Sequence, residues 1–213
     1  MSCRGVETLV VIAKEPVPGR VKTRLVPPLS YEDAARLAAA ALTDTLDVVS
    51  DVPAPRHLLS FDGCPDAWLR QGWDVCVQPP GGLDTRLVAA FASAGTRPAV
   101  LVGMDTPQLE AGQLCAFDPS QFDACLGLAE DGGYWAIGLR EPWMAGAAIT
   151  NIAMSTATTG DLQLRRLRAL GLRVQMLDTL TDVDTIDAAH AVARAAPTSG
   201  FAAALRTIRE AVA

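Results

Sequence analysis

The sequence contains 213 residues, of which 50% are hydrophobic and 20% are charged, as is usual for a globular chain. This length suits a single α/β domain covering residues 1–213, and it can bury a sizeable core without structural metal. The net charge of −6 argues against nucleic acid or an anionic membrane surface as a partner.

Neither a targeting segment nor a membrane span is expected. The apolar run 9–13 is too short for a signal-peptide core, and Lys14-Glu15-Pro16 follows it directly. No stretch approaches the roughly 20 apolar residues that span a bilayer. The five cysteines are scattered without a Cys-x-x-Cys pair, which favours free thiols in a reducing cytosol over disulfides or a zinc site. We therefore expect a cytoplasmic protein, in which His57 and His190 are structural residues.

The predicted elements alternate between strand and helix along the chain. Ser30 is a predicted helix N-cap with Asp33 three residues on, and Gly171 is predicted to end a later helix. In chain order, we expect strands at 8–13, 57–61, 74–77, 99–103, 122–128, 134–139 and 173–177, and helices at 31–50, 65–70, 84–94, 107–116, 160–170, 185–196 and 199–212. This alternation predicts a mostly parallel sheet covered by helices on both faces, with ligands at the carboxyl ends of the strands.

A basic loop directly follows the first predicted strand. Arg20, Lys22 and Arg24 alternate there, so in an extended loop the three cations would face one side. They suit a chain of phosphates, because Arg offers bidentate donors and Lys a point charge. Gly19 would let backbone N–H groups approach an anion closely. A solvated basic loop is the alternative, and neither a Walker A loop nor a Gly-x-Gly-x-x-Gly fingerprint is present.

Lysine usage points to the same loop. Lys14 and Lys22 are the only lysines among 18 basic residues. A chain biased this strongly toward Arg would keep Lys where a compact ammonium matters, whereas chance placement of two rare residues is the alternative.

Carboxylates follow two later strands. Asp105 comes directly after the apolar run 99–103, where it is either a ligand of Mg²⁺ or Mn²⁺ or a turn or N-cap residue. Asp182 and Asp184 alternate, so that one of them could face the site as a second metal ligand. Thr185 is predicted to cap the next helix, and a helix-dipole effect is the better explanation of Asp187.

The segment 130–135 combines acids, a glycine pair and two aromatic side chains. Gly132 and Gly133 could let an acceptor molecule approach the backbone closely, with Asp131 and Tyr134 beside it. A plain turn between two strands is the alternative.

Four motifs in this order resemble the DUF2064 group of the GT-A nucleotide-diphospho-sugar transferase superfamily. They are Lys-x-Pro-x-Pro-Gly-Arg-x-Lys-Thr-Arg-Leu from Lys14, Gly-x-Asp-x-Pro from Gly103, Asp-Gly-Gly-Tyr-Trp-x-Ile-Gly-Leu from Asp131 and Asp-Val-Asp-Thr from Asp182. The stretch 21–49 is also similar to phospholactate guanylyltransferases of the CofC type and, more distantly, to molybdenum-cofactor guanylyltransferases of the MobA type. The chain departs from the family at Met154, where tryptophan is usual, and in the segment 81–86.

The resemblance implies a three-layer, Rossmann-like GT-A fold and a divalent cation, Mg²⁺ or Mn²⁺, that bridges nucleotide phosphates. It assigns catalytic roles to Lys22, Arg24 and Asp105. The other implied roles are phosphate binding by Lys14, Gly19, Arg20, Lys22, Thr23 and Arg24, metal binding by Asp105, Asp182 and Asp184, and acceptor or base recognition by Arg86, Asp131, Gly132, Gly133 and Tyr134.

The sequence therefore favours nucleotidyl transfer from a nucleoside triphosphate to a small phosphorylated or acidic acceptor. Glycosyl transfer from a nucleoside-diphosphate sugar is the alternative within enzymes, because one fold hosts both reactions. Nucleotide binding without turnover is the remaining alternative. We expect a monomer or homodimer whose partners are a nucleotide and a small acceptor, not nucleic acid or a membrane.

Overall fold

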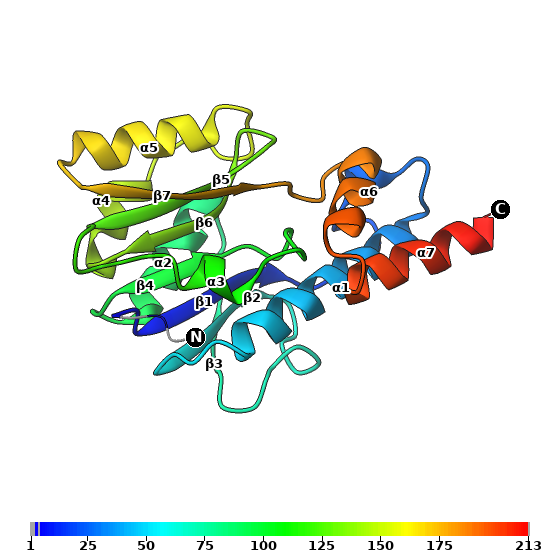
Figure 1. The fold of residues 1–213 in the computed structure, drawn as a ribbon, viewed down its shortest axis with the longest axis horizontal. Helices are drawn as coiled ribbons and strands as arrows, with labels where there is room; N and C mark the ends of the chain where they lie inside the picture. The colour runs from blue at the N-terminus through cyan, green and yellow to red at the C-terminus, as the bar shows by residue number, and fades with distance from the viewer. Residues whose placement is uncertain (1–2, 4, 213) are drawn as a thin grey trace.

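The computed structural model describes residue 3 and residues 5–212, which form a seven-stranded sheet with helices on both faces (Figure 1). The strand order is β3-β2-β1-β4-β6-β5-β7. All neighbouring strands are parallel except β6, which runs antiparallel to β4 and β5. The strands are β1 Thr8–Lys14, β2 Arg56–Asp62, β3 Asp74–Val77, β4 Ala99–Val102, β5 Ala124–Ala129, β6 Tyr134–Leu139 and β7 Val174–Leu180. The predicted mostly parallel sheet is confirmed.

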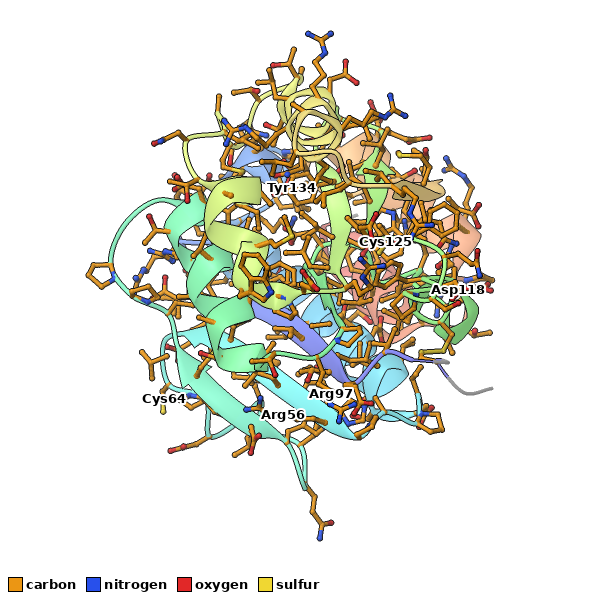
Figure 2. All side chains as sticks on the ribbon, turned by 90° about the vertical axis from the view of Figure 1, so that its left-hand side faces the viewer. Arg56, Cys64, Arg97, Asp118, Cys125 and Tyr134 are labelled. Atoms are coloured by element: carbon orange, nitrogen blue, oxygen red, sulfur yellow. A yellow bond between two sulfur atoms is a disulfide. The ribbon has the colours of Figure 1, made fainter. Side chains whose placement is uncertain are left out.

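Helices cover the two faces of the sheet because successive strand residues point to opposite sides. On one face, α1 (Tyr31–Ser50) and α3 (Ala111–Leu114) share a core with Leu9 and Val11 of β1. On the other face, α2 (Leu83–Ala94), α4 (Ala145–Ile149) and α5 (Thr159–Ala169) share a core with Val10 of β1 and Leu101 of β4. Figure 2 shows α2 and α4 side by side on this second face. These layers confirm the three-layer, Rossmann-like fold.

A third core joins the remaining helices to the outer face of α1. The helices α6 (Ile186–Ala195) and α7 (Gly200–Val212) lie beside α1 (Figure 1) and share apolar side chains with it, among them Leu37 and Phe201. Asp44 of α1 accepts hydrogen bonds from the backbone N–H groups of Gly200 and Phe201 at the start of α7. Within the described residues, no helix combines the length and apolar character needed to cross a membrane.

Two predicted helices differ from the structure. Residues 65–70 form only a turn, in which the N–H groups of Trp68 and Leu69 both donate to the carbonyl of Pro65. Gly72 follows at a φ of 80°, so the costly first helical turn is not extended. The predicted helix 107–116 shrinks to α3, because Glu110 and Gln113 form a capping box that starts it late. The short helices η2 (Pro142–Met144) and α4 were not predicted.

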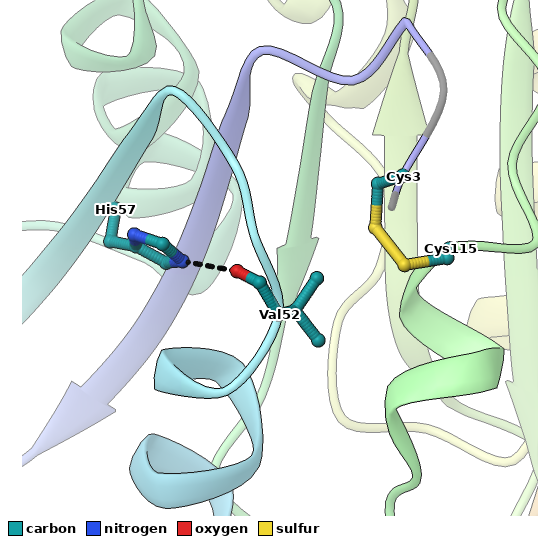
Figure 3. Close-up of a disulfide and its surroundings, with 4 residues drawn as sticks. All are labelled: Cys3, Val52, His57 and Cys115. Carbon is teal, nitrogen blue, oxygen red and sulfur yellow. Dashed lines mark hydrogen bonds between the residues drawn. A yellow bond between two sulfur atoms is a disulfide. The ribbon is translucent and has the colours of Figure 1, made fainter. Parts of the chain in front are cut away.

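The expectation that all the cysteines are free is wrong for two of them. Cys3 and Cys115 form a disulfide that joins the segment before β1 to the end of α3 (Figure 3). Their 112-residue separation explains why no spacing motif indicated it. Cys64, Cys76 and Cys125 are free, and burial raises the pKa of the Cys125 thiol.

His57 is held by contacts that fit the structural role predicted for it. Its Nε2–H donates to the carbonyl of Val52 at 3.0 Å (Figure 3). Its ring also stacks on Trp73, with 5.2 Å between the centroids.

Candidate functional site

A cavity of about 620 Å³ opens at the carboxyl ends of the parallel strands. Ala13 and Lys14 at the end of β1 line it, as do Gly103 and Asp105 directly after β4. Ligands of open α/β sheets bind at this edge. This cavity therefore lies at the edge of the sheet where the strand-helix alternation predicts ligand binding.

The basic loop is not extended, so its alternating cations do not face one side as they would in an extended loop. Val21 and Leu25 are buried and anchor it, and Thr23–Leu25 forms the short helix η1. Lys22 precedes η1 in the left-handed backbone conformation, with φ 47° and ψ 36°. This turn separates the cations, so that the Lys22 side chain is buried while Arg24 is exposed.

Lys22 lies between two of the carboxylates proposed as metal ligands. Its Nζ is 2.7 Å from Oδ1 of Asp105 and 3.2 Å from Oδ1 of Asp184. Burial acts to lower the pKa of the Lys22 ammonium, but attraction and hydrogen bonds from the two carboxylates exceed it and raise the pKa above its ordinary value. Lys22 is therefore charged in the ligand-free protein.

The remaining residues predicted to bind phosphate divide into two groups. Lys14, Thr23 and Arg24 line the cavity together with Lys22, and Arg24 Nη1 lies 2.8 Å from Oδ2 of Asp184. Gly19 and Arg20 are exposed and do not line it. The structure thus gathers four of the six residues at one place.

Backbone hydrogen bonds bring the carboxylate-bearing segments together. The N–H of Val183, between Asp182 and Asp184, donates to the carbonyl of Asp105 at 2.9 Å. The N–H of Glu130 donates to the carbonyl of Leu180 at 3.1 Å. Because Val183 is buried in the α1–α6–α7 core, both neighbouring aspartates turn toward the cavity. Thr185 caps α6 as predicted, by accepting from Ala188 N–H.

Asp131, Asp182 and Asp184 form an acidic group in which one carboxylate oxygen from each lies within 4.8 Å of the others. Burial, with the nearby charges of Asp131 and Asp184, raises the pKa of Asp182 to about 6. Oxygen ligands of this kind suit Mg²⁺ or Mn²⁺. Asp131, which was predicted for acceptor or base recognition, thus joins the proposed metal ligands. The sequence feature that marks Asp131 is its position directly before the glycine pair Gly132-Gly133.

The glycine pair 132–133 packs against the chain itself. A Cβ on Gly132 would collide with the carbonyl of Ala157, and one on Gly160 would meet the carbonyl of Gly133. Gly160 N–H donates to the carbonyl of Gly132 at 2.8 Å. We refer to the contacts of Gly132 and Gly133 with 157–160 as the glycine clamp. It places Gly133, Ser155 and Thr159 in the cavity wall, and no motif in the sequence marks Thr159.

Arg86 lies on the opposite side of the cavity within a polar network. Its Nη1 donates to Asp62 Oδ2 at 2.7 Å and to Gln78 Oε1 at 3.3 Å. Gln78 Nε2 in turn donates to the carbonyls of Ala13 and Ser60. Gln78 was not predicted, since no motif marks it. The network holds Arg86 at the cavity by contacts with β1, β2 and the loop after β3.

Tyr134 lines the cavity from the start of β6 (Figure 2). Its hydroxyl lies 3.5 Å from Oε1 of buried Gln163 and 3.8 Å from the sulfur of Met154. Burial raises the pKa of the Tyr134 hydroxyl, so it is neutral near pH 7. Tyr134 and Met154 give this part of the wall an apolar character.

The fold and the cavity define the class of the protein as an α/β protein with the Rossmann-like fold of nucleotide-diphospho-sugar transferases. The structure of a candidate nucleotide-diphospho-sugar transferase from Desulfovibrio desulfuricans G20 is 27% identical to this chain, with a TM-score of 0.85, and the match covers 99% of this chain and 98% of that one. The family model "Uncharacterized protein conserved in bacteria (DUF2064)" matches residues 35–156. That is more than half of the chain, and the chain belongs to this family.

More distant structures share the fold. Rv0371c from Mycobacterium tuberculosis H37Rv, in a complex with manganese, has a TM-score of 0.55 at 22% identity, over 88% of this chain and 97% of that one. The 2-C-methyl-D-erythritol 4-phosphate cytidylyltransferase from Thermus thermophilus has a TM-score of 0.52 at 15% identity, over 90% and 99%. A comparison with curated proteins gave no match.

Proposed function

We propose that the protein is a metal-dependent nucleotidyltransferase that transfers a nucleotidyl group from a nucleoside triphosphate to a small phosphorylated or acidic acceptor. The observation that carries this proposal is the pairing of charges in one cavity. Lys22 and Arg24 lie against Asp105 and Asp184, and the carboxylates of Asp131 and Asp182 line the same cavity. Such a site can hold polyphosphate and a divalent cation together.

The donor set fits the metal that this reaction needs. Asp131, Asp182 and Asp184 supply only oxygen ligands, and Asp105 adds another carboxylate 2.7 Å from Lys22. Mg²⁺ or Mn²⁺ would be held by these aspartates and would neutralise charge on the phosphates. The manganese complex of Rv0371c, a protein of the same fold, supports a metal site.

In the proposed reaction, an acceptor oxygen attacks the α-phosphorus of the nucleotide. A bond forms between that oxygen and phosphorus, the bond to the β-phosphate oxygen breaks, and pyrophosphate leaves. Lys14, Lys22 and Arg24 would stabilise the negative charge on the leaving pyrophosphate. Catalysis would rest on positioning and electrostatics, because the protein forms no covalent bond.

The two sides of the cavity would recognise the two substrates. Arg86 and Gln78 would contact the base or ribose, because their network adjoins the end of β1. Asp131, Gly133 and Tyr134 would face the acceptor. Residues 1–213 would act as one domain, with a nucleotide and a small acceptor as partners.

Pyrophosphate release tests the proposal. With Mg²⁺, a nucleoside triphosphate and a panel of phosphorylated and carboxylic acceptors, the protein should release pyrophosphate and form a nucleotidylated product. The variant Asp105→Asn should lower kcat by about 100-fold or more while the circular dichroism spectrum is unchanged. The control Asp187→Asn, outside the cavity on α6, should keep wild-type activity. Wild-type turnover by Asp105→Asn would contradict the proposed role of Asp105 in metal binding and catalysis.

Glycosyl transfer from a nucleoside-diphosphate sugar is the second candidate, favoured by the similarity to the Desulfovibrio protein. A thermal-shift panel with Mg²⁺ separates the two, because a ligand that binds the native state raises Tm. Larger shifts with triphosphates support nucleotidyl transfer, and larger shifts with nucleotide sugars support glycosyl transfer. Binding without release of pyrophosphate or nucleoside diphosphate would instead indicate a nucleotide-binding protein without turnover.

A further inference from the structure

The Lys22 ammonium occupies a place between carboxylates that would otherwise repel each other. It contacts Oδ1 of Asp105 and Oδ1 of Asp184, and only 6% of the Lys22 side chain is exposed. Asp184 also belongs to the acidic group with Asp131 and Asp182. One carboxylate therefore serves both the resident ammonium and the proposed metal site.

The backbone of Lys22 is fixed in this position by its neighbours. Its left-handed conformation is unfavourable for a residue with a side chain, and it persists only where the surroundings enforce it. Val21 and Leu25 are buried on either side, and Leu25 N–H donates to the Lys22 carbonyl at 3.0 Å. The four-carbon stem has rotatable bonds, so a change of side-chain rotamer alone would move the ammonium while the backbone stays in place.

The charges in the cavity are unevenly matched. Lys22 and Arg24 both pair with Asp184, whereas no basic side chain in the described part of the chain lies within 4.0 Å of Asp131 or Asp182. A divalent cation near Asp131, Asp182 and Asp184 would lie close to the Lys22 ammonium and be repelled by it. Phosphate oxygens of a nucleotide would offer Lys22 another anionic partner in the same cavity.

We propose that Lys22 is a built-in substitute for the metal ion: it holds Asp105 and Asp184 together in the ligand-free protein and has to leave them before they bind a divalent cation. The proposal rests on the metal site of the proposed function. It implies that the ammonium moves to the phosphates when nucleotide and metal bind together. Metal binding without nucleotide is therefore weakened by Lys22, and nucleotide relieves this weakening.

Direct titration with Mn²⁺ in the absence of nucleotide tests this competition. The variant Lys22→Met, which removes the charge, should bind Mn²⁺ about tenfold more tightly than the wild type, followed by electron paramagnetic resonance of free Mn²⁺. Lys14→Met is the matched control, because Lys14 lines the same cavity but has no carboxylate within 4.0 Å among the described residues. It should change the affinity much less. Unchanged or weaker binding by Lys22→Met, or equal gains in both variants, would overturn the proposal.

A second measurement uses the wild-type protein and does not depend on how a variant folds. Because the chain has only two lysines, labelling with ¹³Cε,¹⁵Nζ-lysine gives one NMR signal for each, and Lys14→Met assigns them. The Lys22 signal should shift on saturation with Mg²⁺ and lose its protection from exchange, while the Lys14 signal changes little. A Lys22 signal that is unaffected by bound Mg²⁺ contradicts the proposal.

The two tests also separate this inference from the function on which it rests. Metal binding that does not depend on Lys22 would overturn the inference and leave the proposed nucleotidyltransferase intact. Failure of both the wild type and Lys22→Met to bind Mn²⁺ would overturn the metal site itself, and the inference with it.

Discussion

Lys22 and Arg20 lie two positions apart in the same loop, yet only Lys22 lines the cavity. Residue type and order were sufficient to propose this loop as a phosphate site. They could not show which cations reach the site, because alternating side chains face one side only where the backbone is extended. The direction of each cationic side chain is instead set by the left-handed turn at Lys22 and by the buried side chains of Val21 and Leu25. Such a turn depends on tertiary packing, which no local pattern contains.

For the carboxylates too, the order of residues in the sequence predicted only part of the site. Their positions after strands predicted a shared site, and Asp105, Asp182 and Asp184 all line one cavity. The proximity of Asp131 was not predicted, because it depends on the pairing of Glu130 with Leu180 across two segments distant in sequence.

Asp123, at the amino end of β5, leads to a prediction about acid stability. The backbone N–H of Arg173, assisted by the guanidinium groups of Arg173 and Arg140, holds the pKa of Asp123 below its ordinary value. A lowered pKa in the native state stabilises the protein above the unfolded value near pH 4, and the contribution is lost as the pH falls through the native pKa.

Asp123→Asn should therefore lower Tm by about 2–4 °C at pH 7 and by progressively less toward pH 2. Thermal unfolding followed at several pH values measures this trend. A Tm difference that stays constant or grows on acidification would contradict it.

Strong local patterns predicted most elements well. Apolar strands, the Ser30 cap and the Gly171 end all lie where expected, and Ser30 accepts from Asp33 N–H as a cap should. The incorrect predictions concern short segments such as 65–70, where a single helical turn forms but does not continue into a helix. Their structure is decided by neighbouring elements, because an isolated turn does not recover the cost of its own formation.

The glycine clamp makes a prediction about two connecting segments. Gly132→Ala should destabilise the protein by about 1–3 kcal/mol, since the φ of 90° disfavours a side chain and the new Cβ would collide with the Ala157 carbonyl. Nucleotide affinity should fall as well, because the clamp positions the cavity wall. Gly146→Ala in α4, where a Cβ meets nothing within 4 Å, should be neutral or stabilising. Equal effects of the two substitutions in denaturant unfolding would count against the clamp.

The Cys3–Cys115 disulfide leads to a prediction in which the stability of the fold changes while nucleotide binding does not. Cys3 precedes the amino end of β1, whereas the cavity lies at the carboxyl end. Cys3→Ser should lower the free energy of unfolding by about 2–4 kcal/mol, because the bond constrains a long loop in the unfolded chain. Nucleotide affinity, measured by calorimetry below the lowered Tm, should remain that of the wild type. A parallel loss of affinity would show that the bond also shapes the cavity.

At the scale of the whole molecule, α1 connects two cores. One side of α1 packs on the sheet through Leu42 and Leu46, and another packs on α6 and α7 through Leu37 and Ala41. The strand-helix alternation was enough to predict the layered sheet. It did not reveal the separate core that α6 and α7 build on α1, because amphipathic helices do not indicate which partner they cover.

This shared helix predicts cooperative unfolding, in keeping with our proposal of one domain over residues 1–213. Unfolding α6 and α7 would expose the apolar outer face of α1 and free the Val183 segment that supports the cavity. Scanning calorimetry should therefore show a single transition with equal calorimetric and van't Hoff enthalpies. Two resolved transitions would instead assign the helical core to an independent unit.

The glycine clamp also has an evolutionary consequence. Gly132 and Gly160 interlock through backbone atoms, so a side chain acquired at either position cannot be accommodated by changing the other residue alone. By contrast, the link between Asp105 and Val183 uses only backbone atoms, so it does not itself require a particular side chain at position 183. Lineages that adapt this cavity to new acceptors should therefore diversify at Tyr134, Met154 and Ser155 while the two glycines stay fixed.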